Sequence, residues 1–422
     1  MKLHVLSFGC QMNEADALEL SYPFLARGFE PCAVLADADA VLVNTCTVRA
    51  HAEHRAVSAV GRLEAWKAAR PGRLVVVAGC AAERLGPELR RRFPFVDLVL
   101  GARSVEETPA LIARALEERG AGPAATDVRP PPGISAYLTV ARGCGFACAY
   151  CIVPSVRGPD RPRALDRVLE EARRLADGGA RELVLLGQTV NGWKDREGRV
   201  FADLLRALAE VPGVLRLRFM SPHPLFLDEA LAAAMAEIPA VCPQLHLPVQ
   251  SGSDRVLAAM GRGYTCADFL SRVRSVRARV SGLALSTDLL VGFPGETAED
   301  FRGTLSLIDE AELAGAYCFK YSPREGTPSF ALADDVEPRV KEERHALLLE
   351  RAEGRRSAEL RSWVGRSVEV LLETPTGGRT PQFHPARFAS PAGAPGTLVE
   401  AEVTGCSQAG LLVQAARRRP LP

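Results

Sequence analysis

The sequence lacks any long apolar run. No stretch of about 18 consecutive apolar residues occurs in the 422 residues, so we expect no membrane-spanning helix. The first residues, MKLHVLSFGCQMNE, reach polar side chains after one strand's length and show no signal-peptide pattern, so we expect a cytoplasmic protein. In that compartment thiols stay reduced, and grouped cysteines bind metal or do chemistry more often than they form disulfides.

An excess of charge of either sign is also absent. The 52 basic residues balance 51 acidic ones to a net charge of +1, so any contact with nucleic acid must come from local patches. Lysine is scarce, because 47 of the basic residues are arginine and only 5 are lysine. Guanidinium groups suit phosphate binding and base stacking. A GC-rich genome produces the same bias, however, and we favour that explanation.

Short apolar runs alternate with charged, helix-like stretches over residues 1–122, which predicts a parallel α/β domain. The runs expected to form buried strands are LHVLSF, AVLVN, LVVVAG and FVDLVLG. The stretch GAGPAATDVRPPPG at 120–133 is rich in Pro and Gly and predicts a linker between domains.

The alternation resumes over residues 130–360 with six candidate strands, and helical segments separate most of them. We expect a second α/β domain, built as a partial (β/α)6 barrel of the TIM type. Its last segment predicts a long, charged helix that is interrupted at Gly354. Residues 362–422 contain short strands between Gly/Pro turns and predict a small β-barrel. The fold class is therefore α/β with a small all-β domain at the C-terminal end.

Three of the eleven cysteines stand in the stretch CGFACAYC, with no fourth cysteine nearby. Three thiolates on one loop can hold three irons of a cubane 4Fe–4S cluster and leave the fourth iron open. A zinc knuckle is the alternative, but zinc sites usually carry paired cysteines in each half. We predict a cluster held by Cys144, Cys148 and Cys151, whose open iron binds a substrate.

A second set of cysteines is dispersed along the first domain. Cys10, Cys46 and Cys80 each follow a predicted parallel strand. A single cysteine at a strand end is more often a small buried hydrophobe. The carboxyl ends of parallel strands form the ligand-binding edge of an α/β sheet, however, so three such cysteines would converge there. We infer a second three-cysteine cluster with one exposed iron.

Several polar residues near predicted strand ends are weaker candidates. Gln188 and Asn191 follow the second strand of the central domain and could bind a cofactor or a substrate, or their amides could only cap the loop. The other polar candidates are Gln250, Ser251, Thr287 and Asp288, with Arg262 and Arg324 as candidates for binding a carboxylate or phosphate. We expect His223 to shape a turn. The cysteines treated as structural are Cys32, Cys242, Cys266, Cys318 and Cys406.

The cysteine loop at the start of a six-unit βα domain resembles the radical S-adenosylmethionine (SAM) superfamily. Over nearly the whole chain the motifs are similar to the methylthiotransferase family, and the C-terminal segment corresponds to its RNA-binding TRAM domain. The stretch 374–396 is richer in Pro and Gly than the family's regular strand pattern. The motifs that carry the resemblance include SFGCQMNEAD, VNTCTVRAHAEHR, VAGCAAE, RGCGFACAYCIVPSVRG, LLGQTVNGW, HLPVQSGSDRVLAAMGRGYT and FKYSPREGTP.

The resemblance implies two 4Fe–4S clusters and SAM as cofactors. It implies that the cluster of the cysteine loop splits SAM to a deoxyadenosyl radical, which removes the hydrogen at carbon 2 of an adenine ring. The second cluster would hold the inserted sulfur, and a second SAM would supply the methyl group. Tyr150 matches an aromatic position of the superfamily, and Tyr150, Gln188, Gln250 and Ser251 are expected near SAM together with Thr287, Asp288 and Arg262.

The residues of these motifs are most similar to those of the family branch that acts on isopentenylated adenosine 37 of tRNA. The implied partners are the tRNA anticodon stem-loop, a one-electron reductant and a sulfur donor, with no membrane partner. Two alternative substrates stay open, namely threonylcarbamoyl adenosine 37 and an aspartate of a ribosomal protein. A non-catalytic electron carrier or a zinc-binding RNA module is the remaining alternative, and it predicts no SAM cleavage.

Overall fold

The structure is a computed structural model that describes residues 1–48, 50–125 and 129–416. The chain forms two compact units. The N-terminal unit comprises Met1–Pro131, Arg142–Ala147 and Cys151–Arg161, and the C-terminal unit comprises Pro132–Ala141, Cys148–Tyr150 and Pro162–Pro422. The predicted domain limits 1–122, 130–360 and 362–422 stay a prediction. Among the described residues, no helix combines the length and the apolar character that crossing a bilayer requires.

The N-terminal unit contains the predicted parallel sheet, with strands in the order β2-β1-β3-β4-β5. Its strands are β1 (Lys2–Ser7), β2 (Glu30–Pro31), β3 (Ala40–Thr45), β4 (Leu74–Gly79) and β5 (Leu98–Gly101). Its helices are α1 (Gln11–Leu25), α2 (Ala50–Ala68), α3 (Cys80–Arg92), α4 (Thr108–Glu118) and the short α5 (Val153–Arg157), with the 3-10 turn η1 (Leu35–Asp37).

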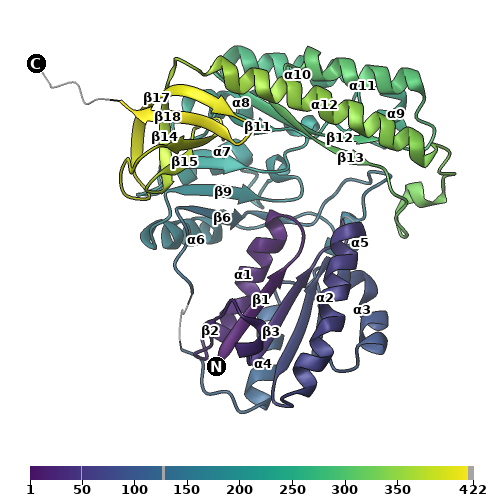
Figure 1. The fold of residues 1–422 in the computed structure, drawn as a ribbon, viewed down its shortest axis with the longest axis vertical. Coiled ribbons are helices and arrows are strands. Elements are labelled where there is room, and N and C mark those ends of the chain that lie inside the picture. Colours follow the sequence, from purple (N-terminus) through teal and green to yellow (C-terminus); the bar gives the residue numbers. More distant parts are fainter. Residues whose placement is uncertain (49, 126–128, 417–422) are drawn as a thin grey trace, which may run out of the picture. The chain divides into compact units, whose positions relative to one another are not determined.

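Alternating side chains of β3 and β4 enter two separate cores. Leu42 and Val76 pack with residues of α1 and α4, whereas Val43 and Val77 pack with residues of α2 and α3. Helices therefore cover both faces of the sheet, as Figure 1 shows. A parallel sheet buried on both faces needs continuous apolar strands, which explains why these two strands could be read directly from the sequence.

The C-terminal unit contains the six predicted parallel strands. They form two three-stranded sheets, β10-β9-β6 and β11-β12-β13, and an isolated parallel bridge between Leu217 and Val241 connects the two. This arrangement is the expected open half-barrel. The strands are β6 (Ser135–Thr139), β9 (Glu182–Leu186), β10 (Arg216–Phe219), β11 (Gln244–His246), β12 (Ala284–Val291) and β13 (Gly315–Lys320), and the short β7 (Ala141–Arg142) pairs with β8 (Arg161–Pro162).

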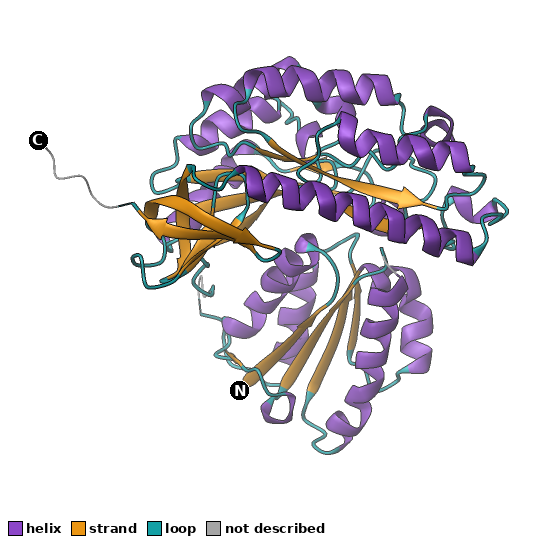
Figure 2. Cartoon of the chain, turned by 45° about the horizontal axis from the view of Figure 1, so that its top comes forward, coloured by secondary structure: helices purple, strands orange, loops and turns teal. Residues whose placement is uncertain are grey.

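The helices of this unit cover the half-barrel, and the last one differs from the prediction. They are α6 (Leu165–Asp177), α7 (Phe201–Ala209), α8 (Glu229–Glu237), α9 (Asp254–Ala259), α10 (Cys266–Arg279), α11 (Ala298–Glu310) and α12 (Pro338–Ser362), with 3-10 turns η2 (Val190–Gly192), η3 (Pro224–Phe226) and η4 (Pro328–Ala331). The predicted interruption at Gly354 is wrong, because α12 is one helix of 25 residues (Figure 2). A glycine inside a helix costs only about 1 kcal/mol of stability relative to alanine. Burial of Leu348, Ala352 and Leu360 on the same helix offsets this cost.

The C-terminal β-barrel is closed, with the strand order β14-β15-β16-β18-β17. Its strands are β14 (Ser367–Thr374), β15 (Gly377–Arg379), β16 (Pro385–Phe388), β17 (Leu398–Ser407) and β18 (Gly410–Ala415). The sequence pattern missed β15, which lies inside the Pro/Gly-rich stretch. A Cβ at Gly378 would lie 2.0 Å from the carbonyl oxygen of Leu371. Glycine is therefore needed at this position, because the backbone of β15 lies too close to β14 for a side chain to fit.

Two buried arginines of β10 attach the barrel to the half-barrel. Arg216 donates to the carbonyl oxygen of Arg379 at 2.6 Å and to the Glu369 carboxylate at 2.9 Å. Arg218 donates to the carbonyl oxygens of Thr380 and Pro381, at 2.8 and 2.7 Å. Removing the barrel would leave both guanidinium groups without these partners, so truncation is not a clean way to test what the barrel does.

The charge of Arg218 is balanced by Glu182 of β9, at 2.6 Å, and both side chains are almost fully buried. Replacing Glu182 by glutamine should destabilise the C-terminal unit by about 3 kcal/mol, because it leaves a buried charge without its counter-ion. Urea unfolding of the full chain, followed by tryptophan fluorescence, measures the shift. The control is Glu170→Gln, which breaks an exposed pair with Arg167 and should cost about 0.5 kcal/mol or less. Equal shifts for the two variants would contradict the prediction.

Candidate functional site

The three dispersed cysteines meet at one edge of the N-terminal sheet, as predicted. Cys10 directly precedes α1, Cys46 directly follows β3, and Cys80 is the first residue of α3 after β4. Strands β1, β3 and β4 are parallel neighbours, so the three positions share the carboxyl edge. Burial raises the pKa of the Cys80 thiol to about 12, opposed by Arg157, while Cys46, Asp16 and Cys10 raise it further. The three thiols are therefore close enough to interact electrostatically.

Hydrogen bonds from side chains to backbone carbonyl oxygens connect the three cysteine loops. Asn13 donates to the carbonyl oxygen of Thr45 at 2.8 Å, and Asn44 donates to the carbonyl oxygen of Asn13 at 2.6 Å. The Thr45 hydroxyl continues the network to the carbonyl oxygen of Ala78 at 2.7 Å. Asn13 and Asn44 are fully buried. Because they tie consecutive strand ends together, they fix the spacing of the three cysteines.

A buried ionic cluster lies beside these cysteines, within the N-terminal unit. Asp16 accepts hydrogen bonds from both Arg142 and Arg157, and all three side chains are buried. Burial alone would lower the pKa of the Arg157 guanidinium, but Asp16, Cys80 and Cys10 raise it above its usual value. Its Nη1 has no hydrogen-bond partner among the described residues. This leaves the Nη1 group of the cation, with its two N–H donors, beside the cysteines.

These features fit a thiolate-ligated group at the edge of the sheet. A Cβ at Gly9 would lie 2.5 Å from Cβ of Cys46, so the first two cysteine loops are in close contact. The free N–H of Arg157 could donate to a sulfide or thiolate. Among the described residues, no group of three or more His, Cys, Asp or Glu side chains is arranged to hold a metal ion. A 4Fe–4S cluster binds each thiolate at a different iron, so its ligands stand further apart.

The cysteine loop 144–151 is divided between the two units and forms backbone hydrogen bonds within each of them. In the N-terminal unit, the amide of Cys144 donates to the carbonyl oxygen of Gly158 at 3.1 Å. In the C-terminal unit, the Ala149 amide donates to the carbonyl oxygen of Met260 at 2.9 Å, and the Ala149 carbonyl oxygen accepts from Ser329 at 2.8 Å. Cys148 is buried, whereas Cys144 and Cys151 are half-buried.

Arg262 lies against Cys148 and Tyr150. Its Nη1 is 3.4 Å from Sγ of Cys148 and 3.5 Å from the Tyr150 hydroxyl, and its Nε donates to Tyr264 at 2.9 Å. Burial alone would lower the pKa of Arg262, but Tyr150, Tyr264 and Cys148 raise it above its usual value. The cationic guanidinium of Arg262 is therefore in direct contact with the sulfur of Cys148. Of the residues predicted to bind SAM, Tyr150 and Arg262 are thus brought together with one cysteine of the loop.

Gln188 and Asn191 have different surroundings. The Asn191 amide donates to the carbonyl oxygen of His223 at 3.0 Å and accepts from the His223 amide at 2.7 Å. Both ends of Asn191 are therefore used in capping its loop, which favours the structural alternative. The Oε1 of Gln188 is buried and has no hydrogen-bond partner among the described residues. Gln188 is thus the better candidate for binding a ligand.

His223 also acts in the turn, as expected. It caps η3 by accepting from the Leu225 amide at 3.3 Å. Burial lowers the pKa of His223 to about 3, with further lowering by Arg262 and Arg272. The imidazole is therefore neutral at physiological pH and cannot act as a general acid there.

The remaining candidates are mostly occupied by local hydrogen bonds. Thr287 and Asp288 lie in the middle of β12 rather than near its end, so that part of the prediction is wrong. The Thr287 hydroxyl donates to the carbonyl oxygen of Leu247 at 2.7 Å and accepts from Val249 at 2.9 Å. Oδ1 of Asp288 lies 3.4 Å from Nε2 of His246.

Gln250 and Ser251 form the loop that follows β11. Gln250 has a left-handed backbone with φ 79°, and its carbonyl oxygen accepts from Leu290 at 2.8 Å. The Ser251 hydroxyl accepts from the Ser253 amide at 3.2 Å. A non-glycine residue in this backbone region is strained and is often found at ligand sites, so Gln250 keeps its candidacy, whereas Ser251 holds the loop.

Comparisons with known proteins agree with this arrangement. Residues 138–308 match the radical SAM superfamily, and residues 2–101 match the uncharacterized protein family UPF0004. The chain is 41% identical to the tRNA-2-methylthio-N(6)-dimethylallyladenosine synthase of Sorangium cellulosum (strain So ce56) over 87% of this chain and 81% of that protein. It is 39% identical to the synthase of the same name from Methylacidiphilum infernorum (isolate V4), over 87% and 83%.

The chain belongs to the radical SAM methylthiotransferase family. The resemblance read from the motifs is confirmed, and with it the assignment as an enzyme. Membership of the radical SAM superfamily implies SAM and a 4Fe–4S cluster as cofactors of this methylthiotransferase.

Solved structures support the fold of the methylthiotransferase. The radical SAM methyltransferase TsrM from Kitasatospora setae, with cobalamin and a [4Fe-4S] cluster bound, aligns with a TM-score of 0.56 over 78% of this chain and 76% of that chain, at 17% identity. The cobalamin-dependent SAM radical enzyme OxsB aligns with a TM-score of 0.52 over 82% and 56%, at 12% identity. At these identities the likeness concerns the fold alone.

Sequence reasoning missed the residues that support the cysteines. Asn13, Asn44, Asp16 and Arg157 are polar residues that the fold buries beside Cys10, Cys46 and Cys80. One signal was available, because Asn44 interrupts the apolar strand β3 two residues before Cys46. A polar side chain in a strand buried on both faces must find a partner.

The contact between Gly9 and Cys46 can be tested with a matched pair of alanine variants. Gly9 (φ 123°) and Gly28 (φ 78°) both have left-handed backbones, but a Cβ at Gly28 would meet no atom within 4 Å. Both variants should lose about 1–2 kcal/mol of stability from backbone strain. Only Gly9→Ala should also bind less iron after anaerobic reconstitution, because its methyl group displaces Cys46. Equal iron contents in the two variants would contradict this account.

Proposed function

We propose that this methylthiotransferase inserts a methylthio group at carbon 2 of N6-isopentenyladenosine at position 37 of tRNA. The observation that carries the proposal is the second set of three cysteines at one edge of the N-terminal sheet, in addition to the cysteine loop. A radical SAM enzyme that only cleaves SAM needs one cluster, whereas sulfur insertion needs a second site for sulfur. The names of the two curated relatives support the same reaction.

Cys144, Cys148 and Cys151 are the proposed ligands of the radical SAM cluster. When bound, that cluster and SAM supply a radical able to remove the hydrogen at carbon 2, which is too weakly acidic for any side-chain base. Arg262 would hold the side chains of Cys148 and Tyr150 in place through its contacts with both. Gln188 and Gln250 are proposed to hydrogen-bond SAM or the target base, with Ser251, Thr287 and Asp288 supporting the same loops. Asn191 would position the loop through His223.

Cys10, Cys46 and Cys80 are the proposed ligands of the second 4Fe–4S cluster. The free Nη1 of Arg157 supports this assignment, because an N–H group beside a cluster can donate to its sulfur atoms. Asp16 would hold the guanidinium in place from the opposite side. With this cluster the enzyme would use two SAM molecules, one for the radical and one for the methyl group.

The proposed partners are the tRNA anticodon stem-loop, a one-electron reductant and a sulfur donor, in the cytoplasm. An anticodon-loop base can leave its stack at low cost and enter a pocket. RNA binding by residues 362–422 stays a prediction. The five barrel strands contain four glutamates and only two arginines, Arg379 and Arg387, so phosphate attraction by these strands is weak. Three further arginines, at 417–419, lie outside the described residues.

Iron counting tests the two-cluster proposal. The anaerobically reconstituted enzyme should bind about eight iron and eight sulfide, if each triplet holds one cubane. Replacing Cys144, Cys148 and Cys151 by alanine should remove about half of the iron and abolish SAM cleavage. Replacing Cys10, Cys46 and Cys80 should remove the other half and leave SAM cleavage measurable. Full iron content in either triple variant would disprove the assignment.

Competition between substrates tests the choice of tRNA. The reduced enzyme is offered tRNA with unmodified, isopentenylated or threonylcarbamoylated adenosine 37, together with ribosomal protein. Methylthio product should form mainly on the isopentenylated tRNA. Burying its five-carbon chain could contribute roughly 2–4 kcal/mol, whereas the carboxylate of the threonylcarbamoyl group would be buried unpaired. Equal or faster turnover of either alternative substrate would place the chain in another branch of the family.

A further inference from the structure

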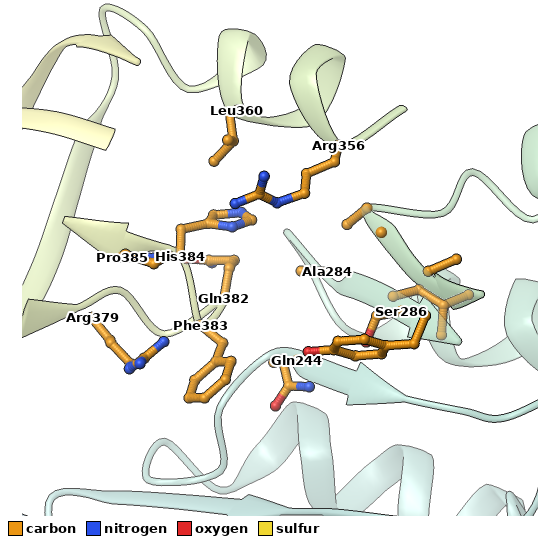
Figure 3. Close-up of a pocket in the computed structure, with 15 residues that line it drawn as sticks. Gln244, Ala284, Ser286, Arg356, Leu360, Arg379, Gln382, Phe383, His384 and Pro385 are labelled. Carbon is orange, nitrogen blue, oxygen red and sulfur yellow. The ribbon is translucent and has the colours of Figure 1, made fainter. Parts of the chain in front are cut away.

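A cavity of about 270 Å³ lies within the C-terminal unit, between the half-barrel and the β-barrel (Figure 3). Gln244, Ala284 and Gly315 line it, and each is the first residue of its strand. The cavity is therefore at the amino ends of β11, β12 and β13. Tyr150 instead packs with Leu290 and Tyr321, near the carboxyl ends of β12 and β13. The cavity is thus separate from the proposed SAM site.

The wall formed by the β-barrel is a strained turn at residues 380–384 that two backbone hydrogen bonds close. Phe383 has a left-handed backbone with φ 72°, which a phenylalanine rarely adopts. The turn is closed by hydrogen bonds from Thr380 to His384 and from Phe383 to Thr380, at 3.0 and 2.9 Å. Arg218 and Arg379 lie 4.8 and 4.3 Å from the ring centroid. Strain of this kind is retained where surrounding structure holds it, often at ligand sites.

The polar groups of the cavity include an unsatisfied acceptor. Gln244 is 7% exposed, and its Oε1 is buried without a hydrogen-bond partner among the described residues. Figure 3 shows Gln244 beside Phe383, with Arg379 on the other side of that ring. Buried polar atoms normally have a partner. An unpartnered amide oxygen at the wall of a cavity therefore points to a ligand with a hydrogen-bond donor.

The cavity also has an aromatic ring on which a base could stack and two arginine side chains. Tyr317 lines it and exposes 58% of its surface, so its ring is accessible to a ligand. Arg356 and Arg379 are the cationic side chains of the lining, and the lining contains no carboxylate. Glutamates outside the lining pair with both arginines and with His384. Glu353 lies 3.4 Å from Arg356, Glu373 lies 3.1 Å from Arg379, and Glu359 lies 3.4 Å from His384. Each pair is partly exposed, so an arginine could still bind a phosphate.

We propose that this cavity binds an unstacked adenine nucleotide, either free or within RNA. The base would stack on Tyr317, as bases do on exposed aromatic rings. Adenine presents the donor, N6–H, that the Gln244 oxygen needs, and glutamine pairs with adenine in this way in nucleic-acid complexes. Arg379 and Arg356 would meet the phosphate. The volume is near the lower limit of small-molecule sites, roughly 300–1,000 Å³, so it suits a single nucleotide.

Binding of AMP to the full-length protein tests the proposal. Saturating SAM is present throughout, so that the adenosine-binding part of the SAM site is filled. Equilibrium dialysis should show AMP binding about tenfold more tightly than ribose 5-phosphate, because the sugar phosphate has no base to stack on Tyr317 or to donate to Gln244. Gln244→Met and Tyr317→Leu should each weaken AMP binding about tenfold.

The matched control is Gln414→Met, the same substitution at an exposed position of β18, which should leave AMP binding unchanged. All three variants should keep SAM cleavage and the urea midpoint of the unaltered protein, which separates lost binding from misfolding. A short oligoadenylate distinguishes the two sources of the nucleotide. Tighter binding than AMP, lost in the cavity variants, indicates RNA, whereas equal binding indicates a free nucleotide.

Failure to bind either AMP or oligoadenylate would overturn the proposal, and so would binding that neither cavity variant weakens. These measurements do not depend on methylthio transfer. The proposed function could therefore fail with the cavity still binding nucleotide, or hold with the cavity empty, and the two results are distinguishable.

Discussion

Parallel pairing of β1, β3 and β4 is the constraint on which the N-terminal site depends. Parallel strands end at the same edge of a sheet, so residues separated by more than thirty positions in the chain are brought together there. Cys10, Cys46 and Cys80 occupy this edge. Because the strands are buried on both faces, a slip in register would expose apolar side chains or bury polar ones, which fixes the positions of the cysteines.

Paired buried arginines hold the parts of each unit in place. In the N-terminal unit Arg142 and Arg157 share Asp16, and in the C-terminal unit Arg218 is balanced by Glu182. A guanidinium group suits these positions because its several donors can serve a carboxylate and backbone carbonyls at once. The arginine-rich composition therefore has structural uses here, whatever its genomic origin.

The two ends of the half-barrel strands differ in chemistry. Near the carboxyl ends, Tyr150 packs with Leu290, Phe293 and Tyr321, and Arg262 touches Cys148. At the amino ends, the strands meet the β-barrel around a cavity lined by Gln244 and Phe383. Half-barrel folds normally concentrate function at the carboxyl ends. The closed barrel adds a second wall at the opposite end and so creates a site that the half-barrel alone would not have.

The sequence by itself determined where most strands lie along the chain, which six cysteines form the two triplets, and the family to which the chain belongs. Buried parallel strands are continuous apolar runs, and the cysteine spacing is local, so both can be read without knowing the fold. Only the tertiary structure decided which polar side chains are already satisfied. Asn191 and Thr287 resemble ligand-binding residues in sequence, yet their hydrogen bonds go to His223 and Leu247. These partners are more than thirty residues away in the chain. A local sequence pattern cannot show them, because packing of the whole unit decides which backbone groups a side chain meets.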